Sequence, residues 1–315
     1  MSRNVYLLTY NKLPNRQLAG EDSPFTQAYE RLDSTSAFFE QHYLQSPGME
    51  AILGNSVAVA KLEHFLADNP VSALALSVGS NHADGWENLP RGFQSEFVSD
   101  IANLNAESAS GTNGGIVWLH CLLDPAQTEA EQRTQFDQCL NWCREQRGAT
   151  ESLLVVTSIN GHEPPDIPFE SVLFDGSVRV PLWIEDGTRQ ASRVQCSTGS
   201  YDVIPTLLHW IGSPQNKTHD QFQETIRQPV SLAELIQRTG EHPKRIIDIR
   251  AKQVMAVRTD DFMFCQGLDE QDPPNEYLLP PGLYSKPEDV WNIHNVAAEY
   301  YDLVRDFQSR LPQSN

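Results

Sequence analysis

The sequence predicts an α/β protein built on a mostly parallel β-sheet with helices on both faces. Three observations support this fold class. Short apolar runs rich in β-branched residues recur along the chain, amphipathic stretches separate them, and polar turn residues close them. Strands that are apolar on both faces are typical of parallel sheets covered by helices on both sides.

The clearest strand covers residues 152–157, where an unbroken apolar run ends at the turn residues Asn160 and Gly161. Because this run is too short for a buried helix, it predicts a central strand. We expect further strands of the same sheet at residues 4–9, 73–78, 116–121 and 178–184.

The clearest helix covers residues 128–147, because Phe136, Leu140 and Cys143 fall on one helical face and Gly148 can end it. Asp202 is an expected N-cap of a helix at 203–211, where Pro205 suits the first turn. Similar patterns predict helices at residues 29–42, 51–68 and 93–104.

The pattern changes beyond Ser213. Residues 245–257 and 262–266 predict strands of a small antiparallel sheet, and residues 230–239 and 297–311 predict helices. We therefore expect an α/β core at residues 1–228 and a C-terminal α+β subdomain at residues 229–315. One aromatic cluster is expected to be the packing face of this subdomain: Trp291, Tyr300, Tyr301 and Phe307.

The chain of 315 residues is strongly acidic, with 23 Lys and Arg against 42 Asp and Glu and a formal charge of −19. This charge disfavours nucleic acids, anionic membranes and heavily sulfated polysaccharides as partners. The chain passes from Met1 directly into a strand, without a signal-peptide pattern, so we expect a cytoplasmic protein. Its five cysteines form no CxxC pair and are expected to be small buried side chains.

Several segments together resemble one known family. Residues 178–181 read Val-Arg-Val-Pro, residues 202–207 read Asp-Val-Ile-Pro-Thr-Leu, and residues 256–264 read Ala-Val-Arg-Thr-Asp-Asp-Phe-Met-Phe. These resemble segments of the sulfatases, within the alkaline phosphatase superfamily. The resemblance implies an alkaline phosphatase-like sheet with a small antiparallel C-terminal subdomain. Sulfatases also hold calcium or magnesium and use a formylglycine made from the Cys of Cys-x-Pro-Ser-Arg.

The expected metal ligands of that family are changed here. Residues 4–13 resemble the family's "Asn-Val-Leu-Leu-Ile-x-x-Asp-Asp-Leu", with Asn11 and Lys12 at the two Asp positions. Residues 158–161 resemble "Ser-Asp-His/Asn-Gly", with Ile159 at the Asp and Asn160 kept. Hard divalent cations need several oxygen ligands with balancing charge, so we expect no calcium, no magnesium and no other cofactor.

The nucleophile and the anion contacts are changed as well. Met49 falls on the family's Cys, Ala126 on a sulfate-binding His, and Glu170 on a Lys. Methionine is no nucleophile, and a carboxylate repels sulfate. With His162, which follows the strand at 152–157, the candidate residues of a vestigial pocket are Asn11, Lys12, Met49, Ala126, Asn160, His162 and Glu170.

We expect a sulfatase-like protein that has lost sulfuric ester hydrolase activity and acts as a binding or regulatory pseudoenzyme. Its partner, a protein or a small molecule, and its oligomeric state stay open. The alternative is a hydrolase of a sulfate or phosphate ester with a rebuilt site. New acid–base pairs for it could come from His162 with Glu163 or from His82 with Asp84, and a hydroxyl nucleophile from Ser46.

Overall fold

The protein is described by a computed structural model that covers residues 3–13, 25–45, 49–69, 71–79, 86–101, 115–147, 151–161, 173–187, 191–212, 229–237, 244–251, 254–267 and 281–311. Within these ranges the main sheet has the strand order β5-β4-β6-β1-β7-β8-β2-β9. Its strands are β1 (Asn4–Tyr10), β2 (Ala37–Phe39), β4 (Ser72–Val78), β5 (Phe93–Val98), β6 (Gly115–Cys121), β7 (Ser152–Ser158), β8 (Leu182–Glu185) and β9 (Ser192–Val194).

Five neighbouring strands, from β5 to β7, run parallel, which confirms the predicted mostly parallel sheet. β8 is antiparallel to both of its neighbours, β7 and β2. The central strands β1, β6 and β7 are buried almost throughout because their side chains are apolar on both faces. Val5 and Leu7 of β1 point to one core, and Tyr6 and Leu8 point to the other.

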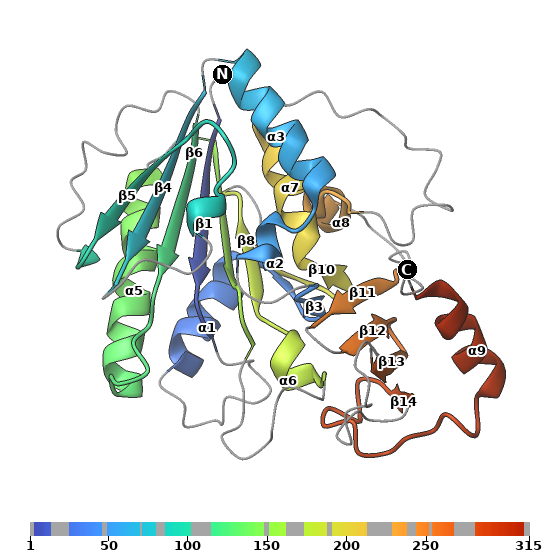
Figure 1. The fold of residues 1–315 in the computed structure, drawn as a ribbon. Coiled ribbons are helices and arrows are strands. Elements are labelled where there is room, and N and C mark those ends of the chain that lie inside the picture. The colour runs from blue at the N-terminus through green and yellow to red at the C-terminus, as the bar shows by residue number, and fades with distance from the viewer. Residues whose placement is uncertain are drawn as a thin grey trace.

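Helices cover both faces of this sheet. Figure 1 shows α1 (Phe25–Thr35) and α5 (Glu129–Arg147) on one side, and their apolar residues form one core with the strands. The opposite face carries α2 (Glu50–Leu53), α3 (Ser56–Asp68), α7 (Val203–Trp210) and α8 (Leu232–Gln237), which contribute to a second core. No described helix is long and apolar enough to pass through a lipid bilayer.

Three helix predictions differ from the structure. The helix expected at 93–104 is the strand β5, which pairs in parallel with β4 at the sheet edge. The helix expected at 29–42 ends at Thr35, and β2 and the short β3 (His42–Tyr43) follow. The helix expected at 51–68 is split into α2 and α3, because Asn55 caps α3 by accepting a hydrogen bond from the Ala58 N–H.

A small antiparallel sheet with the order β11-β12-β13-β14 follows in the chain, as predicted. Its strands are β11 (Ile247–Arg250), β12 (Val254–Arg258), β13 (Phe262–Gly267) and β14 (Gly282–Ser285), and α9 (Tyr301–Arg310) packs on it through Phe307. Leu232 and Leu235 of α8 belong to the core of the main sheet instead. The domain boundary at residues 228 and 229 stays a prediction.

The expected packing face of this subdomain is only partly buried. Phe307 is buried, as predicted, but Tyr301 is 71% exposed, and Trp291 and Tyr300 are 43% exposed. Trp291 stacks on Phe174, with ring centroids 5.4 Å apart, and Tyr300 lies 5.2 Å from Phe262. Each of these two rings therefore packs against one neighbouring ring and leaves part of its surface to solvent.

The small sheet is joined to the main sheet by buried charges near α6 (Asp175–Val178) and β10 (Thr198–Gly199). The Lys286 ammonium lies 3.0 Å from the Asp175 carboxylate, and both side chains are fully buried. The Arg179 guanidinium lies 3.8 Å from the same carboxylate. Asp202 does not cap α7 with its side chain; its carboxylate binds Arg245 and the backbone N–H groups of Gly199 and Val230.

Candidate functional site

The carboxyl ends of β1 and β7 bring two predicted site residues together. Asn11 directly follows β1, and Asn160 lies two residues beyond the end of β7. The strands are parallel and adjacent, so their ends meet at one edge of the sheet. The Asn160 Nδ2 group donates a hydrogen bond of 2.8 Å to the Asn11 carbonyl.

Asn11 uses both ends of its carboxamide on the backbone of Leu123. Its Oδ1 accepts a hydrogen bond of 2.8 Å from the Leu123 N–H, and its Nδ2 donates one of 3.0 Å to the Leu123 carbonyl. The Asn11 N–H in turn donates to the Cys121 carbonyl. This paired amide continues the β1–β6 hydrogen bonding past the end of the strands.

Neither of the residues next to these amides, Ile159 and Lys12, has a side-chain oxygen that could bind a cation. Ile159 is buried and packs in the core that contains α2, α3 and α7. Lys12, next to Asn11, is half-buried and carries a positive charge. The Ser158 hydroxyl is used locally: it accepts from the Leu13 N–H and donates to the Asn160 carbonyl.

Met49 immediately precedes α2, and its side chain is buried in the same core as Ile159. Its carbonyl accepts hydrogen bonds from the N–H groups of Ile52 and Leu53, so the residue starts the short helix. Met49 therefore fills apolar space at the position where the resemblance would place a nucleophile.

Ala126 lies in an exposed turn after β6 and presents only a methyl group. Its N–H donates a hydrogen bond of 2.8 Å to the Asp124 carboxylate, which holds the turn. The remaining candidates, His162 and Glu170, lie outside the described residues, as do Ser46, His82, Asp84 and Glu163. The structure thus joins Asn11 and Asn160, connects them to the segment that carries Ala126, and leaves Met49 in the core.

Below this edge, four buried polar side chains lie side by side across the sheet, and none of them was predicted as a site residue. Ser77, His120, Thr9 and Thr157 lie in register on the adjacent strands β4, β6, β1 and β7, and all four are fully buried. The available signal was their position near the ends of otherwise apolar strands, because each is followed by a polar or turn residue within four positions.

His120 is the titratable member of this row. Its Nδ1 lies 2.8 Å from the Thr9 hydroxyl, which also accepts a hydrogen bond from the Trp118 indole. The His120 Nε2 has no hydrogen-bond partner among the described residues. Burial lowers the pKa of His120 to about 3, so the ring is neutral near neutral pH.

The residues at this edge do not fit a calcium or magnesium ion. The Asn11 oxygen already accepts a backbone hydrogen bond, the position of Ile159 is apolar, and Lys12 adds positive charge. Hard cations require several oxygens with carboxylate charge. In the part of the chain that the structure describes, His, Cys, Asp and Glu nowhere form a group of three that could hold a metal ion.

The fold is shared with solved structures of low sequence identity. A 2-O GAG sulfatase is 12% identical with a TM-score of 0.64, and the alignment covers 98% of this chain and 92% of that one. A phosphonate monoester hydrolase of Agrobacterium radiobacter is 13% identical, with a TM-score of 0.64 and coverage of 98% and 94%. An alkaline phosphatase superfamily protein from Vibrio parahaemolyticus is 12% identical, with a TM-score of 0.60 and coverage of 100% and 89%.

No model of a protein family matches the sequence, and a search of curated proteins finds no match either. At these identities the structural likeness establishes the fold alone. The predicted sulfatase-like, alkaline phosphatase-type fold is confirmed.

Proposed function

We propose that this chain, which has the sulfatase-like fold of the alkaline phosphatase superfamily, has lost ester hydrolysis and acts as a binding or regulatory pseudoenzyme. Its partner on this proposal is a protein or a small molecule that is not strongly anionic, because the chain itself carries a formal charge of −19. A cytoplasmic location remains part of the proposal.

The observation that carries the proposal is that the Asn11 side chain is engaged in backbone hydrogen bonds. In the resemblance this position supplies a metal-binding carboxylate. Here its carboxamide is paired with both backbone polar groups of Leu123, at 2.8 and 3.0 Å. Hydrolysis of a sulfate ester needs positive charge to offset the charge that develops on an already anionic group. The described edge offers instead two carboxamides and one ammonium.

The buried side chains at this edge support the same reading. Met49 and Ile159 are both part of the core, so neither presents a polar group to a substrate. A methionine thioether cannot attack sulfur or phosphorus as an activated hydroxyl or thiolate can.

The alternative is a hydrolase with a rebuilt site for a sulfate or phosphate ester. One structural neighbour is a phosphonate monoester hydrolase, so this fold also carries chemistry on other esters. Such a site would draw on the ammonium of Lys12 in place of a metal.

A substrate screen separates the two functions. The full chain is assayed with aryl sulfates, phosphates, phosphodiesters and phosphonates, each with added calcium, magnesium, manganese or zinc. Wild type and two variants, Asn160→Leu at the edge and Asn141→Asp on the exposed face of α5, are purified in parallel. The proposal predicts the same background rate in all three.

Turnover that saturates with substrate and is lost in Asn160→Leu, but not in Asn141→Asp, would overturn the proposal in favour of the alternative. Equal turnover in all three would point to a contaminating enzyme. The Asn141 control fits this purpose because that side chain is exposed on α5, away from the strand ends.

A further inference from the structure

Three buried polar atoms around His120 have no hydrogen-bond partner among the described residues. They are the His120 Nε2, the Ser77 hydroxyl oxygen and the Trp86 indole nitrogen. Ser77 and His120 are fully buried, and Trp86 is 7% exposed. Native proteins leave few buried polar atoms without a partner, so a group of three at one place calls for an explanation.

His120 is the neighbour of both other side chains. Ser77 of β4 and His120 of β6 are register partners on adjacent parallel strands, so their side chains leave the same face of the sheet about 4.8 Å apart. Trp86 begins the short helix η1 (Trp86–Asn88), and the centroid of its ring lies 5.8 Å from that of His120. The three side chains therefore meet under the carboxyl ends of β4 and β6.

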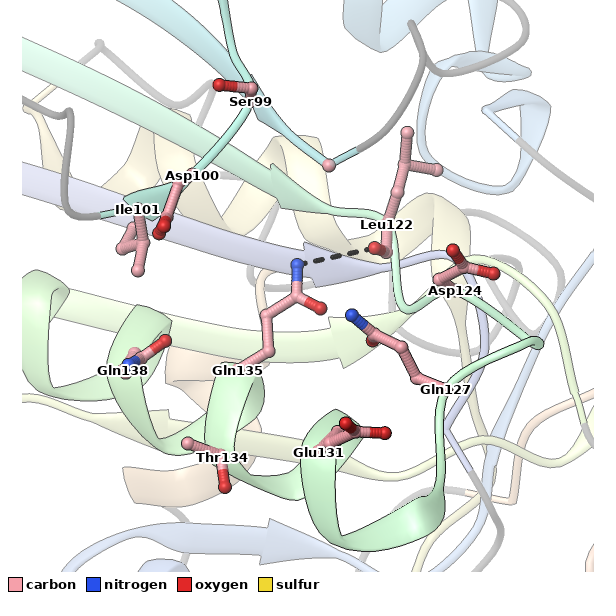
Figure 2. A pocket seen from close by; sticks show the side chains of 11 residues that line it. Ser99, Asp100, Ile101, Leu122, Asp124, Gln127, Glu131, Thr134, Gln135 and Gln138 are labelled. Carbon is pink, nitrogen blue, oxygen red and sulfur yellow. Dashed lines mark hydrogen bonds between the residues drawn. The ribbon is translucent and has the colours of Figure 1, made fainter.

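This meeting point faces the core that α2, α3 and α7 cover. Ala75 and Trp118, which lie two residues before Ser77 and His120 on the same strands, belong to that core. A cavity of about 390 Å³ lies near the same strand ends, but it is lined by Gln135 and Gln138 of α5, as Figure 2 shows. None of the three side chains is among the described residues that line this cavity, so their polar atoms do not open into it.

The hydrogen bonds of Thr9 decide which nitrogen of His120 carries the proton. The Thr9 hydroxyl oxygen accepts a hydrogen bond of 2.8 Å from the Trp118 indole and lies 2.8 Å from the His120 Nδ1. If Thr9 donates its own proton to Nδ1, both groups are satisfied. The opposite direction would leave the Thr9 proton without an acceptor among the described residues. Because burial lowers the pKa of His120 to about 3, the neutral ring has one proton, and that proton is on Nε2.

The three atoms together need one oxygen. The His120 Nε2–H and the Trp86 Nε1–H are both donors, and the Ser77 hydroxyl can donate or accept. An oxygen that accepts from the two N–H groups and donates to Ser77 satisfies all of them. Water in buried sites typically makes about three hydrogen bonds to polar groups that would otherwise lack partners.

A halide ion would also accept from two N–H groups, but the charges here disfavour it. Ser77, His120 and Trp86 are all neutral, and the whole chain carries a formal charge of −19. The loss of hydration of an anion would therefore not be offset by positive charge from these three side chains.

We propose that the protein holds one structural water molecule between the Ser77 hydroxyl, the His120 Nε2–H and the Trp86 Nε1–H. This water extends the hydrogen-bonded series Trp118, Thr9 and His120 to β4 and η1, and so joins the segment that follows β4 to the sheet. The inference does not depend on the proposed loss of hydrolysis, because it uses none of the residues of the vestigial pocket.

The direct test is a crystal structure of the full chain, grown with sodium bromide and measured at the bromine absorption edge. We expect one water peak within hydrogen-bond distance of all three atoms, without anomalous signal. Direct pairing of the three side chains, or no peak between them, would overturn the proposal. An anomalous peak at this position would overturn it as well, because it would show that the site takes an anion.

Urea denaturation of variants gives a second test that depends on the sign of the change. Ser77→Ala removes the hydroxyl. If that hydroxyl had no partner, its removal would relieve an unsatisfied group and raise the denaturation midpoint; if it binds the water, the midpoint falls. We expect a fall. Trp86→Phe removes another bond to the same water, so the double variant should lose less than the sum of the two single losses.

Trp142→Phe is the matched control. The Trp142 indole is also buried without a partner among the described residues, but it lies in the core on the other face of the sheet. Its loss should simply add to that of Ser77→Ala. A Ser77→Ala midpoint at or above that of wild type, or additive losses for Ser77→Ala and Trp86→Phe, would contradict the proposal. None of these results bears on the hydrolysis screen, so the two proposals fail separately.

Discussion

Asn11 shows how a single carboxamide can tie two strand ends together. Its donor and its acceptor face the carbonyl and the N–H of Leu123, so only an amide satisfies both groups. An aspartate at this position would accept from the Leu123 N–H but would set a negative oxygen against the Leu123 carbonyl.

We therefore predict that Asn11→Asp lowers the free energy of unfolding by about 1–3 kcal/mol, as expected for one buried hydrogen bond replaced by an unsatisfied acceptor. Urea denaturation monitored by tryptophan fluorescence measures the change. Asn141→Asp, the same substitution on an exposed helical face, should change stability by less than about 0.5 kcal/mol. An Asn11→Asp variant as stable as wild type would show that the paired amide does not stabilise this edge.

Two buried histidines make the stability depend on pH. Burial lowers the pKa of His120 to about 3 and that of His42 to about 4, from an ordinary value of 6.5. The unfolded chain therefore takes up protons below pH 6.5 that the folded chain does not bind. Stability is full above that pH and falls as the pH drops toward about 4, by up to about 1.4 kcal/mol per pH unit for each histidine.

Urea denaturation midpoints, measured from pH 6.5 down to about pH 4, test this dependence of stability on pH. His120→Phe is expected to lose some stability at neutral pH, because the hydrogen bond to Thr9 is removed, yet to show a shallower pH dependence. His64→Asn, at an exposed site on α3, should keep the wild-type slope. A slope that His120→Phe leaves unchanged would contradict burial of a neutral His120.

Part of the site could be predicted from single residues. Asn11 and Asn160 follow two strands that the sequence identifies as parallel, so their proximity follows from the fold class. The partner of Asn11 could not be predicted, because Leu123 contributes only backbone groups, which any residue carries. The neutral state of His120 depends on burial between strands and is not visible in the local sequence.

Among the elements, β5 is the one that the spacing of apolar residues predicted wrongly, as a helix. Phe93, Phe97 and Ile101 are spaced four residues apart and indicate an amphipathic helix. The segment instead pairs along its length with β4, whose edge would otherwise be open. The strands β1, β6 and β7 were predicted correctly, because their apolar runs are buried on both faces and no helix of that length competes.

Asp202 and Arg245 join two elements through a buried ion pair. Asp202 precedes α7, Arg245 precedes β11, and the pair is bidentate, with N–O distances of 2.5 and 3.0 Å. Both side chains are at most 4% exposed. We predict that Arg245→Ala lowers the free energy of unfolding by about 3–5 kcal/mol, because it leaves the Asp202 carboxylate buried without its cation.

The control is Arg310→Ala, which breaks the exposed pair with Asp306 on α9 and should cost less than about 1 kcal/mol. Urea denaturation of both variants gives the comparison. If both variants lose the same small amount, Asp202 and Arg245 do not hold α7 and β11 together.

At the scale of the whole molecule, the layered sheet and the small C-terminal sheet could be predicted, because apolar periodicity and the sulfatase-like segments both depend on the local sequence. The contacts between the two sheets could not be predicted from the sequence. The ion pair of Lys286 and Asp175 joins residues more than a hundred positions apart, and no spacing rule connects them. The exposure of Tyr301 also depends on how distant segments pack, so it could not be predicted from the local sequence.

The central claim concerns the whole molecule: at the strand ends of this sulfatase-like sheet, amide–backbone bonds and apolar side chains stand where the resemblance would place metal ligands and a nucleophile. This claim is tested most directly by the calcium content of the full chain after equilibration with millimolar calcium at physiological salt, measured by elemental analysis beside Asn160→Leu. We predict no stoichiometric calcium in either protein. One calcium ion per wild-type chain that is lost in Asn160→Leu would contradict the claim.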